Sequence, residues 1–447
     1  MNDGSFNDII CQTAIQTEAD KAQYRDDGYY LAHTEAEVQE KLPGIESSRI
    51  YYDKSMSLGC FYFNEETLAV TNLHLELLST DPGAFCTVEK LKTTIAAAEK
   101  YAAAKNFTPF QLCLPDRMKL EYYGKVFQKF GAVPGLYQQF MDVYQVSDYG
   151  FNGIDMATVN GIINCKTEEE HQATAEMLKD LPDVLTIYRG GNSASADYRK
   201  AYSWTLDINV ANFFACRRGS DEGYIAVATI AKSDVIEYFG DARSEDEVLV
   251  HPEKLTITQV IPVQGITLLE EIIPKVNKLY QEYRSMLNRL KFTHDTNEHG
   301  RLHSLRVLML TQIIAYQMNL PLKERVILAE AAVFHDIKRD NDGIDETHGA
   351  RSAAYYAKVN RNADFFTKFL CKYHCLPDEV CYAEIERNDK LRKNRELATK
   401  LINIFKDADA LDRVRFGIRD LDINQLRLPV SKELTLVARL LLDNLKL

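Results

Sequence analysis

The sequence predicts a multidomain protein with an α+β domain at residues 1–150, a second α+β domain at 151–272 and an all-α domain at 273–447. Three observations predict this organisation. A chain of 447 residues is longer than one hydrophobic core usually supports. Strand-like runs separated by turn residues recur up to about residue 263, and helical spacing of apolar residues dominates afterwards. The composition, 46% apolar and 26% charged, is that of an ordinary globular protein.

The first domain alternates strand-like and helical runs. We expect strands at 49–52, 59–63, 67–78, 110–114 and 138–146, and helices at 87–105 and 122–130. The run from Tyr122 to Tyr144 resembles the C-terminal half of the acetyl-CoA-dependent N-acetyltransferase fold. The segment at Ser79–Ala84 has one glycine and no leading Arg or Gln, so the pyrophosphate loop of that family is not recognisable. The resemblance therefore implies a repurposed, cofactor-free domain that binds a partner, with an active acetyltransferase as the alternative.

The second domain begins after a capped helix from Thr167 to Leu181. Strands are expected at 184–190, 201–205, 223–231, 245–250 and 255–263, with a short helix at 207–215. Arg189, Ser203-Trp204-Thr205 and Glu245-Asp246-Glu247 follow one another along these strands. A guanidinium can hold a pyrophosphate, and a carboxylate can stabilise an oxocarbenium-like ion. The alternative is a helix N-cap at 203–205 and a solvated turn at 245–247.

Those residues resemble the arginine-type mono-ADP-ribosyltransferases, which use NAD and have an α+β split-sheet fold. The resemblance implies that Glu247 is catalytic, that Glu245 orients the acceptor and that Ser203 orients Glu247. It also implies an NAD site, with Trp204 or Phe213 stacking on the nicotinamide. The residues expected to bind NAD are Arg189, Gly190, Ser203, Thr205 and Phe213.

The third domain carries six of the ten histidines between His294 and His374. It is expected to open with a helix at 270–291 that packs against those following it. His303, the pair His335-Asp336 and Asp407 each interrupt the apolar face of a helix. Neutral imidazoles and carboxylates on facing helices suit a divalent cation with open positions for water or phosphate. A satisfied core histidine at 335 beside a helix-end Asp336 is the alternative.

These motifs resemble the HD-superfamily phosphohydrolases and phosphodiesterases over about 290–430. The resemblance implies that His303, His335, Asp336 and Asp407 bind the metal, and that His348 and His374 complete a second metal site or contact phosphate. Arg306, Lys338 and Arg339 are expected to bind phosphate. His299, four residues before His303, could act as a general acid. His299, His303, Arg306, Arg339 and Asp345 also resemble the phosphodiesterase module of the SidE-type phosphoribosyl-ubiquitin ligases. The catalytic residues expected in this domain are His299 and His374.

The leading hypothesis is a bifunctional enzyme in which an NAD-dependent transferase is coupled to a metal-dependent phosphodiesterase or phosphohydrolase. Its acceptor would be a protein or a nucleotide, and the order of the domains departs from that of the SidE type. One alternative is an HD nucleotide phosphohydrolase with a degenerate NAD-binding module. Another is a defence or toxin protein, either an ADP-ribosyltransferase or a non-enzymatic scaffold whose first domain recognises a partner.

Composition narrows the partners and the location. A formal net charge of −12 argues against general binding to nucleic acid or anionic membranes. No apolar run reaches membrane-spanning length, and the first residues lack the pattern of a secretory signal. Nine irregularly spaced cysteines indicate reduced thiols, hence the cytoplasm, or a host cytosol if the protein is a secreted effector. Cys371, Cys375 and Cys381 flank His374, and either a zinc knuckle or apolar packing would account for them.

Overall fold

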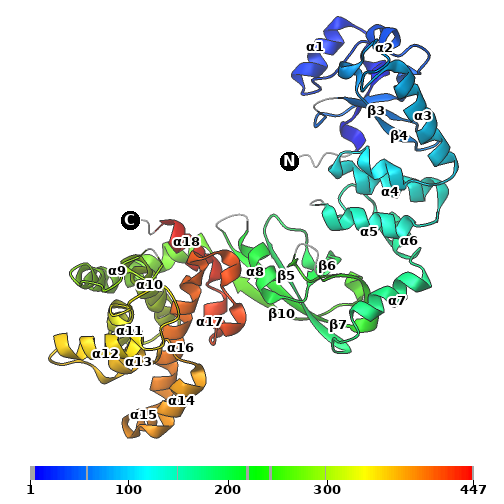
Figure 1. The fold of residues 1–447 in the computed structure, drawn as a ribbon. Helices are drawn as coiled ribbons and strands as arrows, with labels where there is room; N and C mark the ends of the chain where they lie inside the picture. The colour runs from blue at the N-terminus through cyan, green and yellow to red at the C-terminus, as the bar shows by residue number, and fades with distance from the viewer. Residues whose placement is uncertain are drawn as a thin grey trace. The chain divides into compact units, whose positions relative to one another are not determined.

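The computed structural model describes residues 6–56, 59–147, 150–217, 221–240, 244–296 and 298–444. The chain forms two compact units, Met1–Glu176 and Met177–Leu447. Figure 1 labels their helices and strands. Within the described ranges, no helix is long and apolar enough to cross a membrane.

Unit 1 is built on an antiparallel sheet in the order β1-β2-β3-β4. The register pairs Ile50 with Tyr62 and Cys60 with Leu73. Two short helices precede β2, and both open with a capping box, formed by Thr17 in α1 and by Thr34 in α2. These elements span Ile10–Cys11 (β1), Glu18–Asp26 (α1), Glu35–Lys41 (α2), Ile50–Tyr52 (β2), Cys60–Phe63 (β3) and Val70–Leu73 (β4).

Helices complete unit 1. They are Val88–Ala103 (α3), Asp116–Phe130 (α4), Leu136–Val146 (α5), Met156–Ile163 (α6) and Glu168–Met177 (α7). The helix expected at 87–105 is present as α3, and the one expected at 122–130 begins six residues earlier, at Asp116. Two expected strands are wrong. Residues 110–114 contain the end of a 3-10 helix, and 138–146 lie within α5. The last strand required by the acetyltransferase resemblance is therefore a helix.

Unit 2 begins with an antiparallel sheet in the order β10-β7-β5-β6-β9-β8. The strands are Val184–Asn192 (β5), Ser203–Thr205 (β6), Gly223–Ala231 (β7), Val235–Phe239 (β8), Glu247–Val250 (β9) and Thr256–Val263 (β10). Five of them were expected from the sequence, and β8 was not. One helix, Ile208–Cys216 (α8), packs on β5 and β7. Its approach requires Gly190, where a Cβ would lie 1.6 Å from the carbonyl oxygen of Ala211.

The rest of unit 2 is helical. At its centre α10 is buried continuously from His303 to Ala315, and it packs against α9, α11 and α16. The helices are Ile266–Leu287 (α9), Arg301–Gln317 (α10), Leu322–Phe334 (α11), His348–Val359 (α12), Phe365–Tyr373 (α13), Asp378–Arg387 (α14), Asp389–Lys393 (α15), Arg395–Leu411 (α16), Pro429–Lys432 (α17) and Thr435–Asn444 (α18). A short 3-10 helix, Asp412–Arg415 (η10), follows α16 directly.

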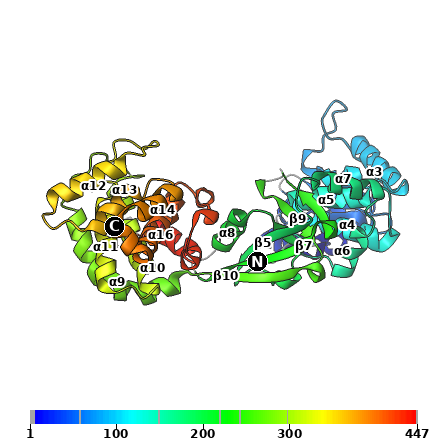
Figure 2. The same ribbon diagram turned by 90° about the horizontal axis from the view of Figure 1, so that it is seen from below.

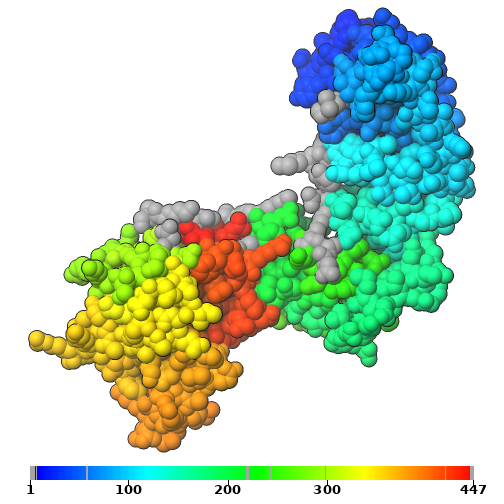
Figure 3. Space-filling view, in the orientation of Figure 1, coloured from blue at the N-terminus to red at the C-terminus, as the bar shows by residue number. Residues whose placement is uncertain are grey.

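The sheet and the helices of unit 2 share one hydrophobic core, which contains Ile225 and Val263 from strands together with Leu305 and Leu328 from helices. Figure 2 shows α8 between the strands and the last part of the chain. The Thr435 hydroxyl donates to Asn212 Oδ1 at 2.7 Å across this junction. In Figure 3 the orange and red surface of the C-terminal residues adjoins the green surface of the sheet. The sheet therefore helps to hold the C-terminal helices in place.

Candidate metal centre

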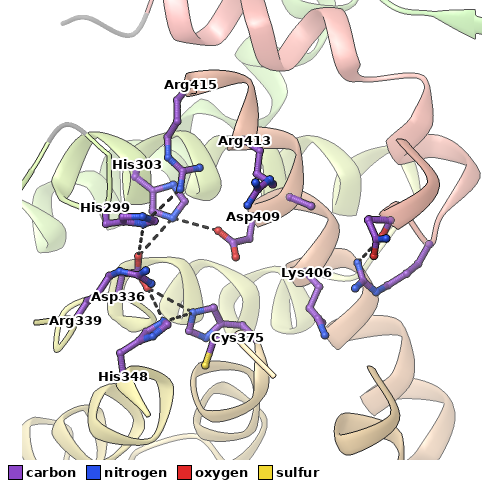
Figure 4. Close-up of a pocket in the computed structure, with 14 residues that line it drawn as sticks. His299, His303, Asp336, Arg339, His348, Cys375, Lys406, Asp409, Arg413 and Arg415 are labelled. Carbon is purple, nitrogen blue, oxygen red and sulfur yellow. Dashed lines mark hydrogen bonds and ion pairs between the residues drawn. The ribbon is translucent and has the colours of Figure 1, made fainter. Parts of the chain in front are cut away.

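Six ligand-type side chains from five helices meet in the helical region. Figure 4 labels four of them, His303, Asp336, His348 and Asp409. Each comes from a helix or its end: His303 from α10, His335 and Asp336 from the end of α11, His348 from the start of α12, His374 from the end of α13 and Asp409 from α16. Five of the six residues are less than one-tenth exposed. Burial of so many polar groups is costly unless they bind one another or a ligand.

The first set comprises His303, His335, Asp336 and Asp409. The Nε2 atoms of His303 and His335 are 3.1 Å apart. Asp409 Oδ1 is 3.2 Å and Asp336 Oδ2 is 3.7 Å from Nε2 of His303. Two nitrogens and two carboxylates therefore surround one point.

The second set comprises His348, His374 and Asp336. The Nε2 atoms of the two histidines are 2.9 Å apart. Asp336 Oδ1 is 3.0 Å from Nε2 of His348 and 3.5 Å from Nε2 of His374. Asp336 thus turns Oδ2 to His303 and Oδ1 to His348 and His374, and Oδ1 is also 3.9 Å from Nε2 of His335. Its carboxylate lies between two neighbouring places for a cation.

The other ring nitrogen of each histidine is held by an oxygen that can only accept a hydrogen bond. Nδ1 of His303 donates to Asp412 Oδ2 at 2.7 Å, and Nδ1 of His335 donates to the Ala332 carbonyl at 3.0 Å. Nδ1 of His374 donates to the Cys371 carbonyl at 2.9 Å, and Nδ1 of His348 donates to the Asp345 carbonyl.

These hydrogen bonds place the proton of each neutral imidazole on Nδ1 and leave Nε2 as a bare lone pair. Bare nitrogens that face each other at 2.9–3.1 Å, with carboxylates beside them, repel one another unless a cation lies between them. The residues present therefore fit a divalent metal ion.

The titration behaviour agrees with this arrangement. Burial lowers the pKa of His335 to about 3, so its imidazole is neutral at ordinary pH. Burial alone would raise the pKa of Asp336, but the surrounding histidines hold it well below its ordinary value of 3.8. Burial and Arg415 lower the pKa of His303, but hydrogen bonds to Asp409 and Asp412 outweigh them and raise it overall. Neutral His335 and ionised Asp336 are thus in the donor states that a metal requires, whereas His303, whose raised pKa favours the protonated form, would lose a proton when a metal binds.

A cavity of about 270 Å³ opens over the two sets, and positively charged side chains line it: Arg339, Lys406, Arg413, Arg415 and Arg427. Most of these cations are already paired. Lys406 and Arg427 share Asp378, and Arg415 donates to Asp412. Arg413 is exposed and its Nε donates to the Asp420 carbonyl at 3.1 Å. Among the described residues, none accepts a hydrogen bond from its two terminal nitrogens, so Arg413 can bind an incoming anion.

The structure corrects one predicted metal ligand, because Asp409 rather than Asp407 faces the cluster. Two residues along a helix rotate a side chain by about 200°, so the two carboxylates point to nearly opposite sides of α16. Asp407 is fully buried and accepts from Arg427 Nη1 at 3.0 Å and from the Leu428 backbone amide at 2.9 Å. Its carboxylate joins α16 to the segment before α17.

Two predicted phosphate ligands also lie elsewhere. Arg306 is buried, and its Nε and Nη2 donate to the two carboxylate oxygens of Asp412 at 2.5 and 3.0 Å. It therefore supports the residue that holds His303. Lys338 Nζ lies 4.4 Å from the ring centre of Tyr355, outside the cavity lining. Arg339 does line the cavity, although its guanidinium donates to the carbonyls of Asn341 and Gly343.

His299 precedes α10 and lines the same cavity. Its Nδ1 is 3.7 Å from Asp336 Oδ2 and 3.4 Å from Arg415 Nη2. The side chain is 12% exposed, whereas that of His303 is 1% exposed. His299 is thus the histidine placed to meet both the cluster and a ligand entering the cavity.

Four of the five residues predicted to bind NAD lie on the adjacent strands β5 and β6, and the fifth, Phe213, lies on α8; Glu247, predicted to be catalytic, begins the next strand, β9. The register pairs Tyr188 with Thr205, and Thr205 with Glu247. Residues paired across adjacent strands lie on the same face of the sheet, so Tyr188, Thr205 and Glu247 share one face. Side chains alternate along β5, so Arg189 lies on the other face, with Ile187 and the buried residues around it.

Hydrogen bonds hold two of these side chains to the backbone of the same sheet. Arg189 Nη1 donates to the Ser203 carbonyl at 2.5 Å, and Thr205 Oγ1 donates to the Glu245 carbonyl at 2.6 Å. Gly190 packs against the backbone of α8, and the guanidinium of Arg419 lies over the ring of Phe213. Trp204 is buried, and its indole Nε1 donates to the Ala201 carbonyl at 2.9 Å.

Comparison with known proteins gives one result. Residues 301–414 match the family model described as HD domain, which runs from α10 into η10. No curated protein and no solved structure matches the chain. The HD match confirms the predicted HD-superfamily region and indicates a metal-dependent phosphohydrolase.

Proposed function

We propose that the C-terminal helical region hydrolyses a phosphoester or a phosphoanhydride with divalent metal ions held by the two histidine sets. The observation that carries this proposal is the convergence of four bare Nε2 atoms on two oxygens of Asp336 and one of Asp409. A bound divalent cation would lower the pKa of a coordinated water and offset the charge on phosphoryl oxygens.

The protein's own side chains supply orientation and proton transfer. Asp412 fixes the ring of His303 through Nδ1, and Arg306 holds Asp412 in turn. His299 borders both Asp336 and the open cavity, so it is placed to protonate the leaving oxygen. Arg413 is placed to bind an oxygen of the phosphate or of a second phosphate attached to it.

The substrate class follows from the lining of the cavity. Five cationic residues surround it in a chain whose formal net charge is −12. A local excess of positive charge on an acidic protein favours a small, strongly anionic substrate over a long polyanion. We therefore expect a nucleotide or an ADP-ribose-type pyrophosphate.

The test is hydrolysis by the metal-loaded full chain. Substrates would be bis-p-nitrophenyl phosphate, nucleoside mono-, di- and triphosphates, and ADP-ribose. We expect turnover that needs a divalent metal and that falls by at least about 100-fold in Asp336→Asn. A folded, metal-loaded protein that leaves all of these substrates intact, or an Asp336→Asn variant with full activity, would contradict the proposal.

A second activity, transfer of ADP-ribose from NAD, stays a prediction of the sequence. It is favoured by the adjacency of β5, β6 and β9, and opposed by the register that separates Arg189 from Glu247. Incubation of the protein with labelled NAD, followed by mass spectrometry, tests whether the sheet transfers ADP-ribose. Label that disappears in Glu247→Gln and persists in Asp336→Asn would assign a transferase to the sheet. If neither protein nor lysate is labelled, the sheet is a module without this activity.

A further inference from the structure

The two places for a cation have unequal sets of ligands. The first is bordered by two histidines and two carboxylates, whereas the second has His348, His374 and one oxygen of Asp336. One more ligand-type atom lies beside the second place. Cys375 Sγ and one ring nitrogen from each of His348 and His374 all lie within 4.8 Å of one another.

The backbone brings this sulfur close to the histidines. Cys375 directly follows His374 at the end of α13, and it faces the first turn of α12. At Gly349 a Cβ would lie 2.6 Å from the Cys371 carbonyl oxygen and 3.0 Å from Cys375 Sγ. A glycine after His348 is therefore needed for α12 to approach the end of α13 so closely.

Cys375 differs from the neighbouring cysteines in what its sulfur faces. Cys371 and Cys381 are fully buried, and their thiols donate to helix-end carbonyls such as those of Ala331 and Tyr373. The thiol of Cys375 also has a carbonyl partner, Glu346 at 3.6 Å, but the residue is half-buried and lines the cavity with the histidines. In Figure 4 its sulfur lies beside His348. The three cysteines therefore do not form a zinc knuckle, and Cys375 alone joins the cluster.

We propose that Cys375 is a sulfur ligand of the cation held by His348, His374 and Asp336. The sulfur–metal bond forms as the thiol proton leaves to solvent, so each cation bound there releases one proton from Cys375. Two nitrogens, one oxygen and one sulfur favour zinc, iron(II) or cobalt(II) over magnesium or manganese. The first place, with nitrogen and oxygen ligands only, lacks this preference. The inference rests on the proposed function only in requiring a cation at the second place.

Cobalt(II) provides a direct spectroscopic test, because thiolate bound to cobalt gives an intense charge-transfer band in the near ultraviolet. The cobalt-loaded full chain should show this band, and Cys375→Ser should lose it while still binding cobalt at the first place. Cys165→Ser is the matched control, since Cys165 is another half-buried thiol and lies in unit 1. It should keep the full band.

Two further measurements keep the inference testable if the variant is poorly folded. X-ray absorption of the zinc-loaded wild-type chain should show a sulfur neighbour at about 2.3 Å. Competition titrations should show that Cys375→Ser loses about 10-fold or more in zinc affinity at one place, with little change for manganese.

The outcomes separate the two proposals. Cobalt or zinc bound only through nitrogen and oxygen overturns the role of Cys375 and leaves the proposed hydrolase standing. A band that persists in Cys375→Ser also overturns it, because the sulfur ligand is then another cysteine. Failure of the wild-type chain to bind any divalent metal overturns both.

Discussion

Replacing Asp412 with Asn tests whether the residues behind the cluster set the affinity for metal. The Asp412 carboxylate is fully buried and accepts from His303 Nδ1 at 2.7 Å, from Arg306 at 2.5 and 3.0 Å and from Arg415 at 3.4 Å. Asn keeps the volume and one accepting oxygen but removes the charge. Breaking a buried ion pair from one side costs about 3–5 kcal/mol, and the retained acceptor favours the lower end, about 3 kcal/mol. Loss of the group that orients a metal-binding histidine should lower metal affinity by about 10- to 100-fold.

The matched control is Asp407→Asn. Asp407 is also fully buried and paired with an arginine, Arg427, but within the part of the chain that the structure describes its carboxylate contacts no histidine. Urea unfolding of both variants should show similar losses in the free energy of unfolding. A chelator is added, because bound metal would otherwise add to the stability of the folded state. Calorimetric titration should show weakened metal binding only in Asp412→Asn. Equal metal affinities in the two variants would refute the role assigned to Asp412.

Three further predictions concern catalysis, substrate binding and pH. His299→Gln should lower kcat by about 100-fold, since a general acid contributes a factor of that size, and should leave the metal content unchanged. A variant that loses metal would instead show that His299 is a metal ligand. Arg413→Ala should raise KM for a diphosphate substrate by about 10-fold. Lys338→Ala is the control, because Lys338 lies outside the cavity lining, and it should leave KM unchanged. Equal effects of the two substitutions on KM would show that Arg413 does not bind the substrate. Burial raises the pKa of Glu37, but hydrogen bonds from Lys21 and the Thr34 backbone outweigh it and lower the pKa from 4.5 to about 2. Glu37 therefore stabilises unit 1 above about pH 4.5, and this contribution disappears as the pH falls towards 2. After solvent screening it amounts to about 1 kcal/mol, so thermal melts of the wild type and Glu37→Gln should differ at pH 6 and converge near pH 2.

Half of the candidate metal cluster could be predicted from the sequence, because His303, His335 and Asp336 each interrupt the apolar face of a helix. His303, His335 and Asp336 were predicted from that pattern, and the structure brings them together with His348 and His374. The pattern could not choose between Asp407 and Asp409. Both carboxylates follow apolar residues of α16 at helical spacing. Asp407 is fully buried, whereas Asp409 lines the cavity.

The partners that hold the cluster were not predictable from local pattern. Asp412 accepts a hydrogen bond from His303, which lies 109 residues earlier in the sequence. The spacing of residues within one helix cannot predict a contact with a residue so far away in the chain. Arg306 was assigned to phosphate because cations near a metal often bind anions. In the fold, a buried carboxylate next to it offers a stronger partner.

Unit 1 shows where strand-like composition misleads. Residues 138–146 contain aromatic and β-branched side chains, a composition that predicts a strand. The buried positions Leu136, Tyr137, Phe140, Met141 and Tyr144 instead follow helical spacing, and this burial against α4 decides the conformation. In the sheet of unit 2, alternating apolar runs were longer, and β5, β7 and β10 matched their predicted ranges closely.

The most direct measurement is anomalous diffraction from crystals of the full chain loaded with zinc or cobalt. We predict one peak among His303, His335, Asp336 and Asp409, and a second among His348, His374 and Asp336. An empty cluster in a metal-loaded crystal, or a peak beside Asp407 instead, would contradict a hydrolase built on these residues.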